Sequence, residues 1–258
     1  MLQYSCKDIA EQIKQYIKTN FINDGLSIAI ISNGSPEGER YIRNKVKVAK
    51  ECGIQANVYT CEDKTPPKVI ADIRKLNETG IIVQMPFTQD KKIDEDIIFF
   101  IPREKDADGL GINPIVPPAT AQGIFMFLQA NDLINNKNIV IIGRSKLVGK
   151  PLAKLLSDTD ATVTMCHSKT KDIKQYTLNA DVVVVAVGQR KFLTKDMVKE
   201  NTIVVDVGIN FDENGKMCGD VDPEVKEHCE VTPVPGGVGL LTTAALMLNI
   251  KNLSYHNA

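Results

Sequence analysis

The sequence has few of the residues that build metal centres, disulfide frameworks or membrane spans. Its 258 residues include no tryptophan and three histidines, and the six cysteines are scattered without a C-x-x-C pair. This pattern favours reduced, buried thiols over disulfides or zinc ligands, and we expect no bound metal. No apolar run is long enough to cross a bilayer, and the mixed, amphipathic N-terminus is unlike a signal peptide. We therefore expect a cytoplasmic protein without a membrane partner.

An excess of charge of one sign is also lacking, since 31 lysines and arginines face 32 aspartates and glutamates. Without a net field, nucleic acid is not expected as a partner. The histidines do not suggest a Ser-His-Asp or Cys-His site: His167 falls in a predicted cofactor turn, His228 in a charged segment and His256 in a polar tail. A general base would then be a lysine, a tyrosine or a carboxylate.

A glycine turn near the middle of the chain is the most informative stretch. The β-branched run Ile139–Ile142 predicts a buried strand, Gly143 follows it, and Gly149-Lys-Pro151 open an apolar helix. Free backbone N–H groups and the helix dipole converge at such a junction, which makes it a phosphate site. The glycine spacing departs from G-x-G-x-x-G, so a tight strand-to-helix corner without a ligand is the alternative.

The strand that follows indicates which nucleotide would bind. An NAD site has an acid about 20 residues after the glycine turn. Here that place reads Cys166-His-Ser-Lys-Thr170, and Arg144 stands in the glycine turn itself. Hydroxyl and cationic groups in these places favour NADP over NAD. Ligands of parallel sheets bind beyond the carboxyl ends of the strands, where Gly143, Gly188 and Gly208 would stand.

Apolar runs alternate with helical patterns along the whole chain, which is typical of α/β structure. We predict two α/β domains joined by linking helices, the second with a Rossmann-type parallel sheet that binds NADP. The first domain is expected at 1–119 plus 246–258 and the second at 120–245. The predicted strands are 26–31, 55–59, 80–85, 139–142, 162–165, 182–186 and 203–207. The predicted helices, besides the one that Gly149 opens, are 5–16, 35–51, 66–77, 91–101, 120–130 and 240–249.

Several polar residues could carry chemistry, although each has a simpler explanation. Tyr41 and Lys45 share a face of the predicted helix 35–51, but the lysines and arginines around them also fit a solvated cationic helix. Gln84 ends an apolar strand and needs a hydrogen-bond partner there, which a purely structural amide would also find. Asp106 and Asp108 lie in a loop where turn chemistry accounts for both.

The stretch Thr232-Pro-Val-Pro-Gly-Gly-Val-Gly239 combines prolines that fix the backbone with glycines that free it. Such a segment can lay backbone amides against a flat ligand.

Together these motifs resemble the bifunctional methylenetetrahydrofolate dehydrogenase/cyclohydrolase family over nearly the full chain. The matching pieces are long and follow the family's order along the chain. They are Tyr41-Ile-x-x-Lys45, Gly80-Ile-Ile-Val-Gln-Met-Pro86, Lys105-Asp-Ala-Asp-Gly109, Gly143-Arg-Ser-x-x-Val-Gly-Lys-Pro151, Ala161-Thr-Val-Thr-x-Cys-His-Ser168, Val205-Asp-Val-Gly-Ile-Asn210, Gly219-Asp-Val-Asp222 and Pro233-Val-Pro-Gly-Gly-Val-Gly239.

The resemblance implies a role for each of these residues. In the family the lysine matching Lys45 is catalytic in the cyclohydrolase step, and the glutamine matching Gln84 bonds to it and tunes it. The tyrosine matching Tyr41 stacks on the folate, and the aspartate matching Asp108 anchors the pterin. The implied catalytic residues are Lys45, Gln84, Tyr41 and Asp108. The implied substrate site is formed by Tyr41, Gln84, Asp108, Pro235, Gly236 and Gly237. The implied NADP site is formed by Gly143, Arg144, Ser145, Val148, Gly149, His167, Ser168, Gly188, Gly208 and Ile209, with Arg144 and Ser168 near the 2′-phosphate.

The activity implied by the resemblance is NADP-dependent oxidation of 5,10-methylenetetrahydrofolate to 5,10-methenyltetrahydrofolate, followed by hydrolysis to 10-formyltetrahydrofolate. We expect one cleft to serve both reactions, in a cytosolic homodimer whose one-carbon product supplies purine biosynthesis. A monofunctional dehydrogenase of the same family is one alternative. Another two-domain NADP oxidoreductase, similar to shikimate dehydrogenase, and a catalytically silent NADP-binding protein are the others.

The chain departs from the family pattern in three places. Gly38 stands where the family usually has a serine, three residues before the tyrosine. Pro-Cys-Thr-Pro becomes Pro118-Ala-Thr-Ala121, with Ala119 and Ala121 as the new residues, and the Pro-Met after the last glycine motif becomes Leu240-Leu241. These places border the expected folate site or its hinges, so they bear on rates and folate affinity.

Overall fold

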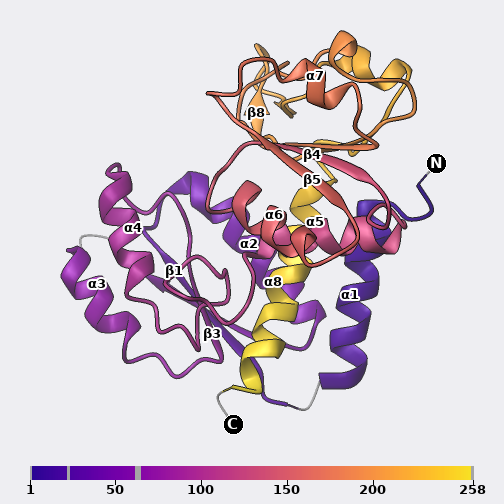
Figure 1. The fold of residues 1–258 in the computed structure, drawn as a ribbon. Coiled ribbons are helices and arrows are strands. Elements are labelled where there is room, and N and C mark those ends of the chain that lie inside the picture. Colours follow the sequence, from indigo (N-terminus) through magenta and orange to yellow (C-terminus); the bar gives the residue numbers. More distant parts are fainter. Residues whose placement is uncertain (1, 22–23, 62–64, 257–258) are drawn as a thin grey trace. The chain divides into compact units, whose positions relative to one another are not determined.

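The computed structural model describes residues 2–21, 24–61 and 65–256, the side chain of Glu37 excepted, and it divides into two compact units (Figure 1). One unit comprises Glu11–Ala119 and Thr243–Ala258, and the other comprises Met1–Ala10 and Thr120–Thr242. The chain passes from one unit to the other within α1 (Cys6–Phe21), at the start of α5 (Ala119–Ala130) and within α8 (Val238–Ser254). None of the helices in the described part of the chain is apolar over the length that a bilayer requires.

The unit that contains residues 11–119 is built on a parallel three-stranded sheet in the order β2-β1-β3. Five of the six residues of the central strand are buried, which explains its unbroken apolar run. The edge strand β2 exposes most of its residues instead. The strands are β1 (Ser27–Ser32), β2 (Gln55–Thr60) and β3 (Gly80–Val83), and the further helices are α2 (Pro36–Glu51), α3 (Pro66–Ile73) and α4 (Lys91–Phe99).

Helix α2 begins and ends as its sequence predicts. Ser35 caps it by accepting a hydrogen bond from Gly38 N, and Pro36 occupies its first turn, where no backbone donor is needed. At its other end, Cys52 N donates to the carbonyls of the last turn, and Gly53 follows with φ +75°. The helix therefore holds Tyr41 and Lys45 in a rigid element with defined ends.

Three predicted helices differ from the observed ones by more than two residues at an end. The first helix continues past Tyr16 to Phe21, because Ile17 on its apolar face is completely buried. The helix predicted at 66–77 ends at Ile73, and the carbonyl of Leu76 accepts a bond from Lys105 Nζ at 2.5 Å instead. The last helix spans Val238–Ser254, longer at both ends than 240–249.

The second unit contains a parallel five-stranded sheet in the order β10-β7-β6-β4-β5. The chain leaves β4 for β5 on one side and later returns to β6 on its other side. The strand order thus switches direction at β4, and the crevice at such a switch is where ligands of doubly wound sheets bind. The strands are β4 (Asn138–Ile142), β5 (Thr162–Cys166), β6 (Val182–Val185), β7 (Ile203–Asp206) and β10 (Glu230–Val231).

The four strands predicted for this unit are confirmed to within a residue at their ends, but three two-residue strands were missed. They are β10 and the antiparallel pair β8 (Asn210–Phe211) and β9 (Met217–Cys218). A two-residue strand is too short to show alternation, so the sequence gives no signal for it. The remaining elements are α6 (Gly149–Ser157), α7 (Lys174–Thr177) and the 3₁₀ helices η1 (Lys195–Met197) and η2 (Pro223–Glu227).

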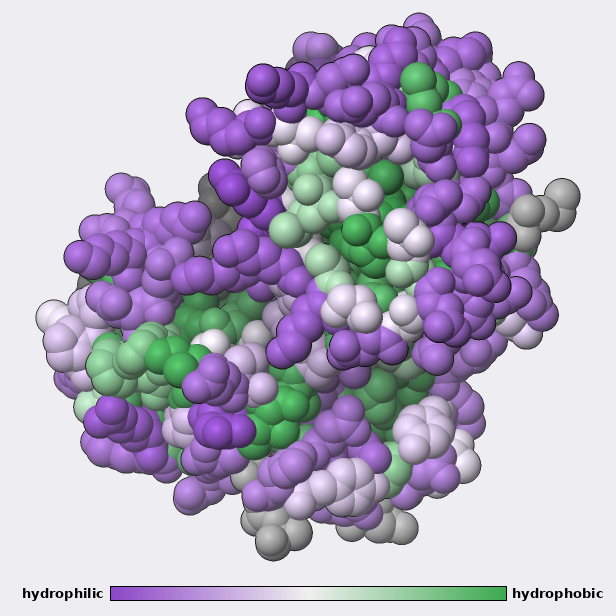
Figure 2. All heavy atoms as spheres, viewed as in Figure 1, coloured by the Kyte–Doolittle hydropathy of each residue, from purple (hydrophilic) through white to green (hydrophobic). Residues whose placement is uncertain are grey.

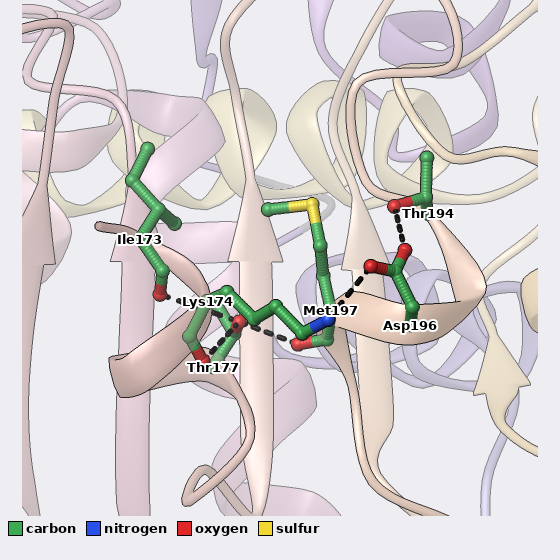
Figure 3. A network of polar contacts seen from close by, with 6 residues as sticks. All are labelled: Ile173, Lys174, Thr177, Thr194, Asp196 and Met197. Carbon is green, nitrogen blue, oxygen red and sulfur yellow. Dashed lines mark hydrogen bonds and ion pairs between the residues drawn. The ribbon is translucent and has the colours of Figure 1, made fainter. Parts of the chain in front are cut away.

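A polar network joins α7 to η1 at the outside of this sheet (Figure 3). The hydroxyl of the fully buried Thr177 donates to the carbonyl of Met197 at 2.5 Å, and Lys174 Nζ pairs with Asp196 Oδ2 at 2.8 Å. Thr194 Oγ1 donates to the other oxygen of Asp196 at 2.6 Å. These bonds fix the long connection between β6 and β7 without using the carboxyl ends of the strands.

The compact units differ from the expected domain division in residues 2–10 and 243–245. The N-terminal segment belongs with the nucleotide-type sheet, because Leu2 N donates to Glu230 Oε2 at 2.7 Å and Tyr4 exchanges two hydrogen bonds with Asn131. A division into independently folding domains at 1–119 plus 246–258 and 120–245 stays a prediction. Five of the six cysteines are buried, as expected.

Candidate active site

The clearest feature of the candidate site is a hydrogen bond between Lys45 and Gln84. Lys45 Nζ on α2 donates to Gln84 Oε1, at the carboxyl end of β3, over 2.6 Å. Gln84 is 9% exposed, its Nε2 donates to the carbonyl of Met85, and its backbone N donates to Ile31 O of the central strand. The amide is thereby oriented so that its oxygen meets the amine.

The electrostatic setting of Lys45 differs from that of an ordinary surface lysine. Its side chain is half-buried, and this burial lowers the pKa of the amine, while the charge of Asp108 partly restores it. Burial likewise raises the pKa of Asp108, which Lys45 counteracts. Desolvation therefore moves both groups towards their neutral forms, which suits an amine that must accept and release a proton near neutral pH.

The neighbours of Lys45 on α2 show how far the simpler reading of this helix holds. Arg40, Arg43 and Lys47 are exposed and form the solvated cationic face that the sequence also allowed. That reading is wrong for Lys45, which turns inward to Gln84. Tyr41, one turn before it, is 40% exposed and presents its ring at the surface of the same unit.

Gly38 leaves space beside this pair. A Cβ atom at Gly38 would lie 3.5 Å from Gln84 Cγ and 3.2 Å from Ser35 Oγ. A serine at this position would therefore fill a place against Gln84. With glycine at position 38, the Gln84 side chain has one contact fewer on the side that faces α2.

Asp106 shapes the loop that carries Asp108. It is completely buried, and its two carboxylate oxygens accept hydrogen bonds from Gly109 N at 3.0 Å and Gly111 N at 2.7 Å. The loop is attached to β3, since Ile81 N donates to Lys105 O and Ala107 N donates to Ile81 O. The turn chemistry expected for Asp106 is confirmed, and its consequence is that the Asp108 carboxylate is placed where it acts on Lys45.

Acidification should stabilise the fold through Asp106. Burial raises its pKa from 3.8 to about 6, so between these values the folded protein binds a proton that the unfolded chain does not. Stability from this group must then increase as the pH falls. Relative to Asp106→Asn, the wild type should gain about 2 kcal/mol of unfolding free energy between about pH 7 and about pH 4.5. Urea unfolding of both proteins at several pH values measures it, and a constant difference would contradict the burial of an ionisable carboxyl.

The glycine turn after β4 has the form that a nucleotide phosphate requires. Gly143 has φ +122°, and a Cβ there would lie 2.3 Å from Ala186 O. Gly149 is buried at the start of α6, where a Cβ would lie 2.0 Å from Gly143 O. Ser145 Oγ accepts a bond from Val148 N, which closes the turn onto the helix. Only glycines fit these two positions, because the turn packs backbone against backbone with Ala186 and with the start of α6.

The other expected nucleotide residues lie at the carboxyl ends of the neighbouring strands. His167 and Ser168 form a turn after β5, in which His167 N donates to Thr170 Oγ1, and Ser168 is exposed. Gly143 N donates to Cys166 O, so this turn and the glycine turn are held side by side. Arg144 is also exposed, as a residue that binds a phosphate must be.

Gly188 and Gly208 follow β6 and β7, and Ile209 is 54% exposed next to Gly208. Figure 2 shows apolar residues exposed on the unit that carries these strands, within a mostly hydrophilic surface. Leu147, in the glycine turn, is 51% exposed. Exposed apolar side chains beside a phosphate turn offer surface for the flat rings of a nucleotide.

The segment Pro233–Gly239 ends in helix α8. The Val234–Pro235 peptide bond is cis, Gly236 has φ +94°, and a Cβ at Gly237 would lie 2.2 Å from Pro233 O. Its start is anchored to β7, because Thr232 Oγ1 accepts a bond from Asp206 N and Thr232 N donates to Val204 O. The expected substrate residues therefore divide between the units: Tyr41, Gln84 and Asp108 in one, Pro235, Gly236 and Gly237 in the other.

Two buried carboxylates in the nucleotide-type unit received no role from the sequence. Asp206 and Asp220 are 5% and 0% exposed. A glycine close to each aspartate is the sequence signal that could have predicted a structural role for it. Gly208 follows Asp206 by two residues, and Gly219 directly precedes Asp220. Among the described residues, His, Cys, Asp and Glu side chains form no cluster suited to a metal ion.

Comparison with known families covers almost the whole chain. The model for the tetrahydrofolate dehydrogenase/cyclohydrolase catalytic domain matches residues 4–108, and that for the NAD(P)-binding domain of the same family matches residues 118–257. Bifunctional protein FolD 2 of Syntrophomonas wolfei is 38% identical over 271 residues, which cover 98% of this chain and 99% of that protein. Bifunctional protein FolD of Burkholderia lata is 41% identical over 249 residues, covering 87% and 84%.

Solved structures give the same result. The bifunctional FolD methylenetetrahydrofolate dehydrogenase/cyclohydrolase of Campylobacter jejuni has a TM-score of 0.85 at 36% identity, covering 98% of this chain and 96% of that one. The FolD enzyme of Trypanosoma brucei, solved with NADP cofactor and an inhibitor, has a TM-score of 0.82 at 29% identity, covering 98% and 95%. The similarity therefore extends through both units.

Proposed function

The chain belongs to the tetrahydrofolate dehydrogenase/cyclohydrolase family, and from this premise we propose how its residues carry out two successive reactions. It is a bifunctional enzyme that oxidises 5,10-methylenetetrahydrofolate with NADP and hydrolyses the methenyl product to 10-formyltetrahydrofolate. The observation that carries the assignment of the second reaction is the half-buried amine of Lys45, held on Gln84 Oε1 at 2.6 Å.

The residues of the glycine turn fit NADP. Gly143 and Gly149 allow the tight turn that leads from β4 into α6, and the N-terminus of this helix can bind a pyrophosphate. Arg144 and Ser168 are exposed where the adenosine ribose is expected, and they would hold its 2′-phosphate by a charge-assisted and a hydroxyl hydrogen bond. Gly188, Gly208 and Ile209 would line the nicotinamide end. When bound, NADP supplies the hydride acceptor, and the chain's contribution to this step is to position the substrate.

The hydrolysis depends on Lys45. In its neutral form the amine accepts a proton from the water that attacks the methenyl carbon, as a new carbon–oxygen bond forms. The bond from this carbon to N5 then breaks as the new hydroxyl becomes the formyl C=O and loses its proton to solvent. N5 takes up the proton that the amine accepted, so the formyl group stays on N10 and one proton is released overall. Gln84 orients the amine, and burial keeps its pKa low enough for the neutral form to be available.

Two further residues hold the folate. Asp108 is placed by the Asp106 turn to accept hydrogen bonds from the amino-pyrimidine edge of the pterin. Tyr41, with its exposed ring on the same helix as Lys45, stacks on the folate. Pro235, Gly236 and Gly237 present a backbone of fixed shape to the substrate.

The assay for both reactions separates this function from its alternatives. With 5,10-methylenetetrahydrofolate and NADP, the enzyme should produce NADPH, and with methenyltetrahydrofolate alone it should produce 10-formyltetrahydrofolate without any nucleotide. NADPH production without hydrolysis would identify a monofunctional dehydrogenase. An NADP oxidoreductase similar to shikimate dehydrogenase, or a silent NADP-binding protein, would show neither activity, and that result would refute the proposal.

The assembly and the cellular setting are finer parts of the proposal. We expect a cytoplasmic homodimer whose 10-formyltetrahydrofolate supplies purine biosynthesis, as the resemblance to the family implies. Sedimentation equilibrium at enzyme-assay concentrations would measure the oligomeric state, and a monomer there would refute the dimer.

A further inference from the structure

Asp206 and Asp220 form a pair of buried carboxylates behind the loops that follow β6 and β7. Asp206 Oδ1 accepts hydrogen bonds from Asp220 N at 2.9 Å and Gly208 N at 3.1 Å, and its Oδ2 accepts one from Val221 N at 3.2 Å. The carboxylate at the end of β7 therefore fixes the backbone on which Asp220 is carried.

Asp220 in turn joins two separate loops. Its Oδ2 accepts hydrogen bonds from Val187 N at 2.8 Å and Gly188 N at 3.0 Å, after β6. Its Oδ1 accepts one from Asn210 Nδ2 at 2.9 Å, at the start of the β8–β9 hairpin. Three donors from two loops thus converge on one side chain, and both of its oxygens act as acceptors.

The backbone around the two carboxylates is closed to any side chain. A Cβ at Gly208 would lie 2.3 Å from Asp220 Cγ, and a Cβ at Gly219 would lie 1.9 Å from Asp206 Oδ2. Neither carboxylate forms an ion pair with a lysine or arginine within the described parts of the chain. Burying two such groups costs free energy, and backbone N–H groups together with the side-chain amide of Asn210 offset it. This is more than β6 and β7 need, since they already pair along their whole length.

What these bonds position is the backbone of the expected nicotinamide end. Asp220 holds Gly188 directly, and Asp206 and Asp220 together hold Gly208 and Asn210, on either side of Ile209. We propose that Asp220, supported by Asp206, is a positioning residue for the dehydrogenase: it sets the spacing of the loops after β6 and β7 that receive the nicotinamide nucleotide. This inference rests on the proposed NADP site.

The test uses Asp220→Asn in the full-length enzyme, with Asp222→Asn as its matched control. The amide introduced by Asp220→Asn would turn a donor towards Asn210, so the loops would lose their common acceptor. The control removes the same charge two residues away, from a carboxylate that accepts a hydrogen bond from Glu224 N and pairs with exposed Lys191. We expect Asp220→Asn to raise the Kd for NADP, measured by calorimetry, about tenfold or more, and Asp222→Asn to leave it within about twofold.

Hydrolysis of methenyltetrahydrofolate without nucleotide distinguishes positioning from general damage to the fold. We expect Asp220→Asn to keep the wild-type hydrolysis rate while its NADP affinity falls. Equal losses in both, or an unchanged NADP affinity, would overturn the inference. If Asp220→Asn does not fold, Asn210→Ala decides the question, because it removes one donor at a half-buried position; an unchanged NADP Kd in that variant would overturn the inference as well.

The NADP affinities also separate the role of Asp220 from the assignment of the NADP site. A wild-type enzyme that binds no NADP would refute the cofactor site itself. A wild-type enzyme that binds NADP as tightly as its Asp220→Asn variant would refute only the role of Asp220.

Discussion

Replacement of Lys45 by methionine is expected to lower the rate of methenyltetrahydrofolate hydrolysis by about 10²- to 10⁴-fold, the usual contribution of a positioned general acid–base group. Methionine keeps an unbranched side chain of similar volume, so the packing of α2 should persist while the amine is lost. The oxidation of methylenetetrahydrofolate requires positioning rather than proton transfer, so NADPH production should remain measurable. Parallel assays of both reactions, with the purified variant, give the two rates.

Lys47→Met is the control for this experiment. Lys47 lies on the same helix, but its side chain is 75% exposed, and its pairing with Glu51 at 3.9 Å is weak. We expect wild-type rates for both reactions in this variant. A Lys45→Met enzyme that hydrolyses methenyltetrahydrofolate at the full rate would remove Lys45 from the mechanism, and the general base would have to be sought elsewhere.

The second large effect concerns the nucleotide. Arg144→Ala should raise the KM for NADP by roughly 10- to 100-fold and change the KM for NAD by less than about threefold, because only NADP has a 2′-phosphate. A charge-assisted hydrogen bond of this kind is worth about 1.5–3 kcal/mol, which sets the size of the effect. Initial rates of reduced nucleotide formation, measured over a range of each nucleotide, give both constants.

Lys154→Ala removes a positive charge from the exposed side of α6 and serves as the control for Arg144. If both variants weakened NADP to the same degree, the effect would be one of general charge near the helix. If Arg144→Ala weakened NADP and NAD equally, Arg144 would contact a part common to both nucleotides, and the assignment of the 2′-phosphate to it would be wrong.

The strongest features of the sequence predicted the fold and the helix that carries Lys45 well. The β-branched runs at 139–142 and 182–185 became fully or almost fully buried central strands, since their side chains can pack only in a sheet covered on both faces. Ser35 and Pro36 marked the start of α2 correctly, and spacing placed Tyr41 and Lys45 on one face of it. Neighbouring residues determine these features, so they can be predicted from the sequence alone.

Tertiary contacts decided the rest. Charge and helical spacing alone do not distinguish Lys45 from Lys47. The difference in burial comes from Gln84, which is 39 residues away and reaches Lys45 only when β3 pairs with β1. Helix α3 ends at Ile73, and the carbonyl of Leu76 just beyond it is bonded by Lys105, which is 29 residues away. The buried pair Asp206 and Asp220 looks like two ordinary turn aspartates until the sheet brings their loops together.

Because Asp206 N donates to Thr232 Oγ1, the end of β7 is bonded to two segments that are expected to bind ligands. Through its carboxylate, Asp206 holds the loops expected at the nicotinamide, and through its backbone it holds the start of the Pro233–Gly239 segment expected at the folate. When one ligand immobilises its loop, the other loop is partly ordered as well, and the second ligand then loses less conformational entropy on binding. Each substrate should therefore increase the affinity for the other, without any change in the average structure. By linkage the gain must be equal in both directions, and NADP titrations with and without bound folate would measure it.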